Sequence, residues 1–443
     1  MRPRFALLYI SIALVMPGGV VAQAAPSSGA VPQSPATPPP QAGRPLPPAI
    51  TIEQAIALAK KNNPTLNANQ MLIAQSKAQE ITANLRPNPV LSWDLQYLPI
   101  FEPGLFGDSN YWETQAQYDV GIGYLFERGH KRQQRLQAAK DTTSVTEAQV
   151  ADSERTTTGN VAQQFVAALL AESNLEFAHT LLDSFDRTVK ISEDRYSAGA
   201  ISKADVLKIR LQRLQFQTDV NTALLSRNQA LASLRQLIGF DSVPAEYQIA
   251  GRLTYEPVTA KLEELQARAL ALRSDLLASQ REITAAQSQI ALARANGKVD
   301  LGVTFNYTRF NQNNLGAFYF NIPLPVFNRN QGEIARTQYA LTQSQFQEKG
   351  VEQTVLTDVK AAHEALRRSQ DTVELYDGGY LQQAQQSLEI AQFSYEHGAA
   401  SLLDFLDAER SYRGTELSYR QALANYMTAL EQLRLAVGTR DIQ

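Results

Sequence analysis

The chain has no cysteine, only four histidines and four methionines, and a formal net charge of −3. Without cysteine, disulfides, thiolate metal sites and lipid acylation of a cysteine at the mature N-terminus are excluded. The charge balance gives no electrostatic reason to expect nucleic acid as a partner. Beyond the first residues, no run approaches the ~18 apolar residues of a membrane helix, so a membrane role has to rest on β-strands.

Motifs for catalysis and cofactor binding are also missing. His363-Glu364 begins like a zinc-protease helix, but Arg367 stands where the second histidine should be. Gly121-x-Gly123 lacks the third glycine of a dinucleotide fingerprint. We expect no catalytic residue, no cofactor and no dedicated metal site, because the four histidines have no ligand spacing: His130, His179, His363 and His397.

Residues 1–24 are typical of a secretory signal peptide, with Arg2 and Arg4 before a short apolar stretch and small residues at the end. Residues 25–49 follow as a proline-rich segment: nine of the twenty prolines lie between Pro26 and Pro48. Such a segment cannot bury a core and is predicted to be an extended, semi-rigid linker.

The rest of the chain is an internal duplication. Residues 195–239 recur without a gap as residues 394–438, with 13 of the 45 positions identical. The halves align again near their beginnings, at a constant offset of 210. We therefore divide the chain into a first repeat, 50–248, and a second, 249–443. Each is predicted to run helix, strand, strand, long helix, Tyr-x-x-Gly turn, helix.

Long stretches rich in Ala, Leu, Gln and Glu, with Pro64 as their one proline, predict the helices. Bends are expected at Gly159, Gly350 and Gly378-Gly379. Within these helices, apolar residues recur at intervals of three, four and seven residues, and Gln, Ser and Thr occupy much of the rest. This pattern suits a helical wall around a hydrated lumen and equally an antiparallel coiled coil. The predicted helices span 51–86, 129–196, 201–238, 258–297, 332–396 and 400–437.

Four shorter segments alternate apolar and polar residues, as strands with one apolar face do. Polar or glycine-rich loops at 102–112 and 311–316 predict one hairpin per repeat. Aromatic residues collect on these hairpins, as at the rims of a membrane barrel. The strands are expected near 90–101, 114–126, 299–310 and 316–327.

Four such strands leave two unpaired edges. In lipid, each unsatisfied backbone N–H or C=O group costs several kcal/mol, and four strands are too few to close a barrel that spans a membrane. Several copies must therefore pool their strands. Closure of the barrel by pooled strands is compatible with two, three or four copies of the chain.

The signal peptide, the duplication, the paired hairpins and the Tyr-x-x-Gly-x-x-Ser-x-x-Asp turns together resemble the TolC-type outer-membrane efflux channels, the outer membrane factors, over residues 50–438. Residues 127–132, Glu-Arg-Gly-His-Lys-Arg, are similar to the CzcC/CusC-like heavy-metal branch. The resemblance implies a mainly α fold with a membrane β-barrel: a homotrimer with a 12-stranded barrel in the outer membrane lipid and an α-helical tunnel through the periplasm. It also implies two partners, a periplasmic membrane-fusion adaptor and an inner-membrane resistance-nodulation-division pump.

The same resemblance implies roles for the two turns. They match the periplasmic tip where the adaptor docks, and Asp404 and Asp407 match the acidic rings of the channel constriction. Lys208 replaces the equivalent of Asp407 in the first repeat. The plainer alternatives are turns that only end helices and carboxylates on a solvated face. The tip residues are Tyr196, Gly199, Ser202, Asp205, Tyr395, Gly398 and Ser401.

The leading hypothesis is a passive outer-membrane exit channel of a tripartite efflux system, without enzymatic activity, passing metal cations or small toxic compounds. Two alternatives are a secreted coiled-coil structural or adhesive protein and a TolC-like duct for type I protein secretion. A periplasmic adaptor is disfavoured, because it would need no amphipathic hairpins.

Overall fold

The computed structural model describes residues 49–442. The expected signal peptide, 1–24, and the expected linker, 25–49, lie outside the described residues except for Ala49. Among the described residues, no helix is both long enough and apolar enough to cross a membrane.

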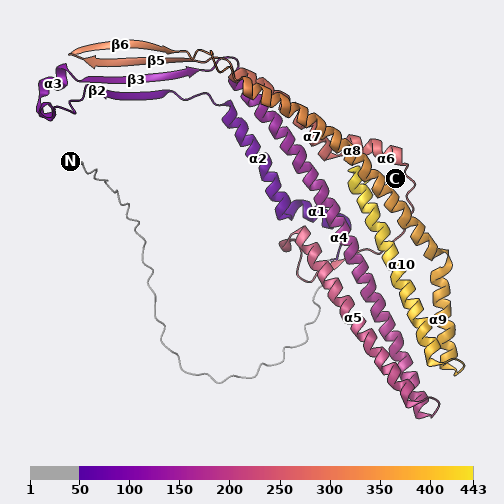
Figure 1. The fold of residues 1–443 in the computed structure, drawn as a ribbon. Coiled ribbons are helices and arrows are strands. Elements are labelled where there is room, and N and C mark those ends of the chain that lie inside the picture. The colour runs from indigo at the N-terminus through magenta and orange to yellow at the C-terminus, as the bar shows by residue number, and fades with distance from the viewer. Residues whose placement is uncertain (1–48, 443) are drawn as a thin grey trace, which may run out of the picture. The chain divides into compact units, whose positions relative to one another are not determined.

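The two halves run through the same order of elements, which Figure 1 shows in colours from indigo to yellow. Short additional elements are β1 (Ala49–Ile50), η1 (Pro103–Gly107), α3 (Ser109–Thr114), η2 (Phe240–Ser242) and β4 (Gln248–Ile249). The first half contains α1 (Ile52–Asn62), α2 (Pro64–Asn84), β2 (Val90–Gln96), β3 (Gln117–Phe126), α4 (Lys131–Ser197) and α5 (Lys203–Ile238). The second contains α6 (Leu262–Leu272), α7 (Ser274–Asn296), β5 (Leu301–Phe310), β6 (Asn313–Asn321), α8 (Gln331–Leu375), η3 (Tyr376–Tyr380), α9 (Leu381–Glu396) and α10 (Leu402–Val437).

The first predicted helix of each repeat is broken once. The breaks fall at Asn63 and Arg273, which are equivalent at the offset of 210, and both residues have extended backbone. Pro64 occupies the first turn of α2, where its missing N–H costs nothing, and the Asn63 side chain caps the helix by accepting from the Leu66 amide at 3.0 Å. Nothing in the helical periodicity had indicated these breaks.

Only one of the three glycine bends is present. Gly379 has φ 120° inside η3, a π-helical turn between α8 and α9. The helix α4 runs unbroken through Gly159, and α8 runs unbroken through Gly350. Gly159 serves packing instead: a Cβ there would lie 2.8 Å from a methyl carbon of Leu435, so the missing side chain lets α10 approach α4.

The four long strands form one antiparallel sheet in the order β2-β3-β5-β6, so the two hairpins meet through β3 and β5. Directly opposite residues share a face. One row across the sheet is Trp93, Val120 and Tyr307, and the next is Asp94, Asp119 and Thr308. The sheet therefore has an apolar face and a polar face. The strands β2 and β6 are each left with one unpaired edge in the single chain.

The strand ends differ from those expected. The first strand stops at Gln96 because Tyr97 turns into a positive φ of 56°, and the second starts only at Gln117, after α3. The last strand ends at Asn321 rather than near 327, since Pro323 and Pro325 cannot donate to a ladder. The second hairpin loop is shorter than 311–316: residues 311–312 form the turn with positive φ, and β6 begins at 313.

The helices bury their apolar stripes in three clusters. One joins α1 to α4 and α5, a second joins α6 to α8 and α10, and a third joins the two helical hairpins near their turns. The helix α4 packs against α2, α5, α7 and α10, and thus connects the two repeats. The short strands β1 and β4 pair in parallel and add a second link between them.

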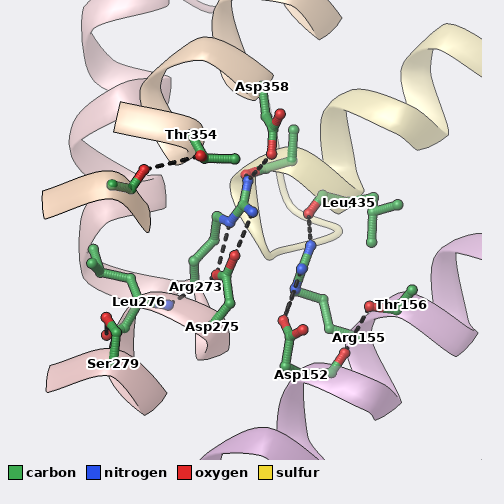
Figure 2. Close-up of polar contacts among 12 residues, drawn as sticks. Asp152, Arg155, Thr156, Arg273, Asp275, Leu276, Ser279, Thr354, Asp358 and Leu435 are labelled. Carbon is green, nitrogen blue, oxygen red and sulfur yellow. Dashed lines mark hydrogen bonds and ion pairs between the residues drawn. The ribbon is translucent and has the colours of Figure 1, made fainter. Parts of the chain in front are cut away.

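Two arginines close the C-terminal end of α10 (Figure 2). Arg273, only 5% exposed, donates to Asp275 at 2.6 and 3.0 Å, to Asp358 at 2.9 Å, and more weakly to the Ala436 carbonyl at 3.4 Å. Arg155 donates to the Leu435 carbonyl at 2.6 Å. These carbonyls have no partner within the helix, and cations are favoured at this end of its dipole.

The same cluster has an electrostatic signature. Burial alone would raise the pKa of Asp275, but the hydrogen bonds and the charge of Arg273 outweigh it and hold that pKa below its ordinary value. The resulting stabilisation is fully present above the ordinary Asp pKa of about 4 and is lost as the pH falls through the lower folded-state value.

We expect Arg273→Met to lower the free energy of unfolding by about 3–5 kcal/mol, because it leaves two carboxylates of a partly buried cluster without their cation. Thermal and denaturant unfolding followed by circular dichroism will measure the loss. The control is Arg368→Met, which removes an exposed pair with Asp371 and should cost about 1 kcal/mol or less. Equal losses in the two variants would contradict the role given to Arg273.

Candidate functional site at the helical turns

The two Tyr-x-x-Gly turns have the same backbone hydrogen bonds. Gly199 has φ 73° and Gly398 has φ 78°. At the first turn the Gly199 amide donates to the Tyr196 carbonyl at 2.9 Å and the Ala200 amide to the Arg195 carbonyl at 2.8 Å. The second turn repeats both bonds. This is the Schellman arrangement, in which a left-handed residue ends the helix, so the glycines are required for helix termination.

A serine then begins the next helix in each turn. Ser202 and Ser401 accept from the amides of Asp205 and Asp404 at 3.1 and 3.2 Å. The Asp404 carboxylate also accepts from the Ser401 amide at 3.1 Å and from its hydroxyl at 2.7 Å, completing a capping box. The Ser401 hydrogen bonds, hydroxyl first, hold the pKa of Asp404 below its ordinary value.

The carboxylates proposed for the constriction are therefore in different situations. Asp404 is exposed, but its Oδ2 accepts from both the amide and the hydroxyl of Ser401. Asp407 lies one turn later on α10, is exposed, and forms no hydrogen bond or ion pair with any described residue. Its counterpart Lys208 is likewise exposed. Of the two, only Asp407 has both carboxylate oxygens without a hydrogen bond from a described residue.

The tip residues are not equally accessible. Tyr196 is 43% exposed, and Gly199 and Ser202 are exposed as well. Tyr395 is only 3% exposed. Any contribution of Tyr395 to docking would thus be made through the backbone of its turn.

Tyr395 is buried because the two helical hairpins of one chain meet there. Arg195 of α4 donates to the Tyr395 carbonyl at 2.5 Å and lies over its ring, 5.1 Å from the centroid. The Tyr395 hydroxyl is 3.1 Å from the Ser192 hydroxyl. The Tyr395 ring also stacks on Phe405, with centroids 5.5 Å apart. Among residues 49–442, Tyr196 of the first turn has no such partner.

A buried carboxyl lies one turn beyond Phe405. Glu409 is 5% exposed, and its Oε1 has no hydrogen-bond partner among the described residues. Burial raises the pKa of Glu409 to about 7, with Arg413 and Arg410 opposing the rise and Asp219 adding to it. This carboxyl therefore titrates near neutral pH.

The described residues contain no cluster of three or more metal-ligating acidic, histidine or cysteine side chains. His397 is used locally: its Nδ1 lies 2.8 Å from the Phe393 carbonyl and its ring stacks on Phe393 at 4.0 Å.

Sequence reasoning missed Arg195 and Glu409. Arg195 has Ser394 as its counterpart in the second repeat, so the duplication could not reveal it. Glu409 could have been found, because Leu402, Phe405 and Glu409 follow the three-and-four spacing of a buried stripe.

The chain matches the family of outer membrane efflux proteins over residues 55–240 and 265–439. It is 26% identical to the cobalt-zinc-cadmium resistance protein CzcC of Cupriavidus metallidurans, over 100% of this chain and 99% of that protein. It is 22% identical to the outer membrane protein TolC of Escherichia coli (strain K12), over 89% of this chain and 83% of that protein.

Solved channels share the fold. A crystal structure of CusC superposes with a TM-score of 0.71 at 20% identity, covering 88% of this chain and 92% of that chain. The Campylobacter jejuni CmeC outer membrane channel gives 0.72 at 16% identity, covering 88% and 86%. The predicted fold class, long helical hairpins joined to strands of a membrane barrel, is confirmed by this likeness.

The chain belongs to the outer membrane efflux protein family, whose members are channels. It is an outer-membrane efflux channel of the CzcC/CusC-like kind, located in the outer membrane and extending into the periplasm. It works as a trimer with a periplasmic adaptor and a resistance-nodulation-division pump. The family assignment replaces the alternative of a secreted coiled-coil structural protein.

The buried carboxyl of Glu409 makes the stability of the folded state depend on pH. A folded-state pKa near 7, above the ordinary Glu value of about 4.3, means that the folded state loses stability as the pH rises from about 4 through 7. Glu409→Gln should therefore match the wild type near pH 4 and exceed it by up to about 3 kcal/mol at pH 8. Unfolding midpoints measured across this range test the prediction. The exposed Glu364→Gln serves as control and should show no pH-dependent gain; a parallel response of both variants would refute the assignment.

Proposed function

We propose that this channel is a passive conduit, without catalysis, and that its cargo is metal cations. Two observations support a cationic cargo. The relative matched over the full chain is a cobalt-zinc-cadmium resistance protein. The exposed carboxylate of Asp407 follows the second helical turn, where a threefold assembly repeats it around one axis. A ring of like charges at an aqueous neck concentrates the opposite ion.

In this proposal the two carboxylates of the constriction have separate tasks. Asp404 shapes the neck by capping α10, since its Oδ2 accepts two hydrogen bonds from Ser401. Asp407 supplies the ring that attracts cations. Because Lys208 occupies the equivalent place, only the second repeat contributes to this ring, and the first repeat opposes it with a positive charge.

We also propose that the exposed surface of the turns docks the adaptor. The accessible contacts are Tyr196, Gly199, Ser202, Asp205 and Gly398, and Tyr395 holds the second turn in place from within. There is open space around Gly199: no atom lies within 4 Å of the position a Cβ would take. A partner can therefore approach the backbone of this turn closely.

The proposed chain organisation is a signal peptide at 1–24, a linker at 25–49, and repeats at 50–248 and 249–443. The breaks at Asn63 and Arg273, which fall at the same place in both halves, support the repeat division. No observation favours protein secretion over ion efflux.

For the constriction, we expect Asp407→Asn to reduce cation over anion selectivity severalfold while leaving the trimer and the Ser401 cap intact. Lys208→Asp should have the opposite effect, because it adds a second ring. Reversal potentials under a salt gradient in planar bilayers measure both. If neither substitution moves the reversal potential, Asp407 does not face the conduction path.

For docking, we expect Gly199→Asn to abolish export with the trimer still in the membrane. Asparagine tolerates positive φ, so the turn persists while a side chain enters the contact surface. The measurement is metal resistance of cells together with adaptor co-purification. Lys349→Asn, on an exposed position of α8, is the control and should export normally. Normal export by Gly199→Asn would restrict Gly199 to ending the helix.

A further inference from the structure

The joint between the strands and the helices is strongly basic, although the whole chain is acidic. Figure 1 shows the strands meeting the ends of α2 and α7 and the beginnings of α4 and α8 at one place. The segments there, residues 85–90, 125–136, 291–301 and 322–336, hold nine Lys and Arg side chains against three carboxylates. The net charge of the whole chain is −3.

All three carboxylates of the joint are already neutralised. Glu127 pairs with Arg135 at 2.5 Å, Asp300 with Lys131 at 2.7 Å, and Glu333 with Arg336 at 2.6 Å. The Glu127–Arg135 pair also ties α4 to the end of α2, because Arg135 donates to the carbonyls of residues 83 and 85. Glu127 and Lys131 of the Glu-Arg-Gly-His-Lys-Arg segment are thus held in ion pairs. The three pairs include only three of the nine cations at the joint.

The remaining six cations have no carboxylate partner among residues 49–442. We call them the basic collar. All are exposed except Arg132, which is partly exposed. They are contributed by four chain segments that are far apart in the sequence, so the positive charge arises from the fold. The collar consists of Arg86, Arg128, Arg132, Arg294, Lys298 and Arg329.

Exposed apolar side chains lie beside the collar at the joint. Leu85, 60% exposed, precedes Arg86; Phe126, 50% exposed, lies two residues before Arg128; and Phe327, 91% exposed, lies two residues before Arg329. At three of the four places where the chain passes between the sheet and the helices, an apolar residue stands one or two positions before an arginine; at the fourth, Lys298 precedes Val299. The apolar band of the sheet is thereby bordered by positive charge.

We propose that the basic collar binds the phosphate groups of anionic phospholipids in the periplasmic leaflet of the outer membrane. The collar continues an established interface, because the apolar face of the sheet meets the hydrocarbon. Exposed apolar groups beside the collar suit the edge of that hydrocarbon, and long cationic side chains reach from there to the headgroups. Arginine is suited to phosphate because its planar fork can donate two hydrogen bonds to one group.

The bound lipid would fix how deeply the barrel sits in the membrane and would stabilise the joint. This adds a lipid partner to the efflux function and does not depend on which cargo passes through the channel. A collar of this kind attracts anionic surfaces within a Debye length, so its effect should weaken with salt.

The test uses the full-length trimer in a non-ionic detergent. Short-chain phosphatidylglycerol should raise its thermal midpoint by a few degrees at low salt, since a ligand that binds only the folded state stabilises it. Short-chain phosphatidylcholine should not, and high salt should remove the effect. The variant R86Q/R128Q/R294Q removes three exposed side chains that have no carboxylate partner among residues 49–442, and it should lose the response. The control K349Q/K360Q/R367Q removes three exposed cations of α8 and should keep it.

Four outcomes would overturn the proposal. They are equal shifts with both lipids, an equal shift with inorganic phosphate alone, loss of the response in the α8 control, and a changed reversal potential in the collar variant without a lipid effect. The last would mean that the collar faces the lumen. If the collar variant fails to assemble, the thermal midpoints of the wild type with each of the two lipids and at low and high salt still test the proposal. Conductance of the same wild-type preparation tests the channel function separately, so the two failures can be told apart.

Discussion

The unpaired edges of β2 and β6 are the constraint on which the architecture depends. A backbone N–H or C=O group in hydrocarbon has no water to bond, so an open edge in a membrane is costly at every residue. The apolar face of this sheet requires lipid and its edges require further strands, and one chain cannot meet both needs. The trimer meets them by letting the edge of one sheet pair with the next. The helices inherit the same symmetry, because each strand is connected at one end to a long helix.

Duplication supplies the two hairpins and the two turns, but the repeats have diverged where they meet. Tyr395 is held between Arg195 and Phe405, whereas Tyr196 remains exposed. These differences fall in the third hydrophobic cluster, where the two helical hairpins of one chain join. Once two copies of a unit pack against each other, their surfaces are no longer equivalent. The turn of the second repeat is therefore covered at Tyr395, whereas the turn of the first repeat remains exposed at Tyr196 and is available to a different partner.

Charge is distributed along the molecule in the same unequal way. Near the turns, the carboxylate of Asp407 has no partner among the described residues. In the central cluster, Arg273 and Arg155 donate to carboxylates and to carbonyls at the end of α10. At the joint between strands and helices, the cations of the basic collar have no carboxylate partner among residues 49–442. The arginines of the central cluster donate their hydrogen bonds to carboxylates and carbonyls of this chain, so they are not available to a mobile ion or a lipid. The net charge of −3 for the whole chain does not show this separation of positive and negative regions.

Local patterns in the sequence determined the elements: the alternation of Trp93 and its neighbours, the three-and-four spacing of the helices, and the Tyr-x-x-Gly turns whose glycines take positive φ. These signals depend on neighbouring residues, which is why they can be read from one chain. The strand ends at Gln96 and Asn321 and the unbroken helix through Gly159 could not be read in this way. The three-and-four spacing of Leu402, Phe405 and Glu409 could have indicated that Glu409 is buried. The burial of Tyr395, the arginines at the end of α10 and the basic collar were decided only by tertiary structure. Each joins residues tens to hundreds of positions apart, and no local pattern records which side chains will meet there.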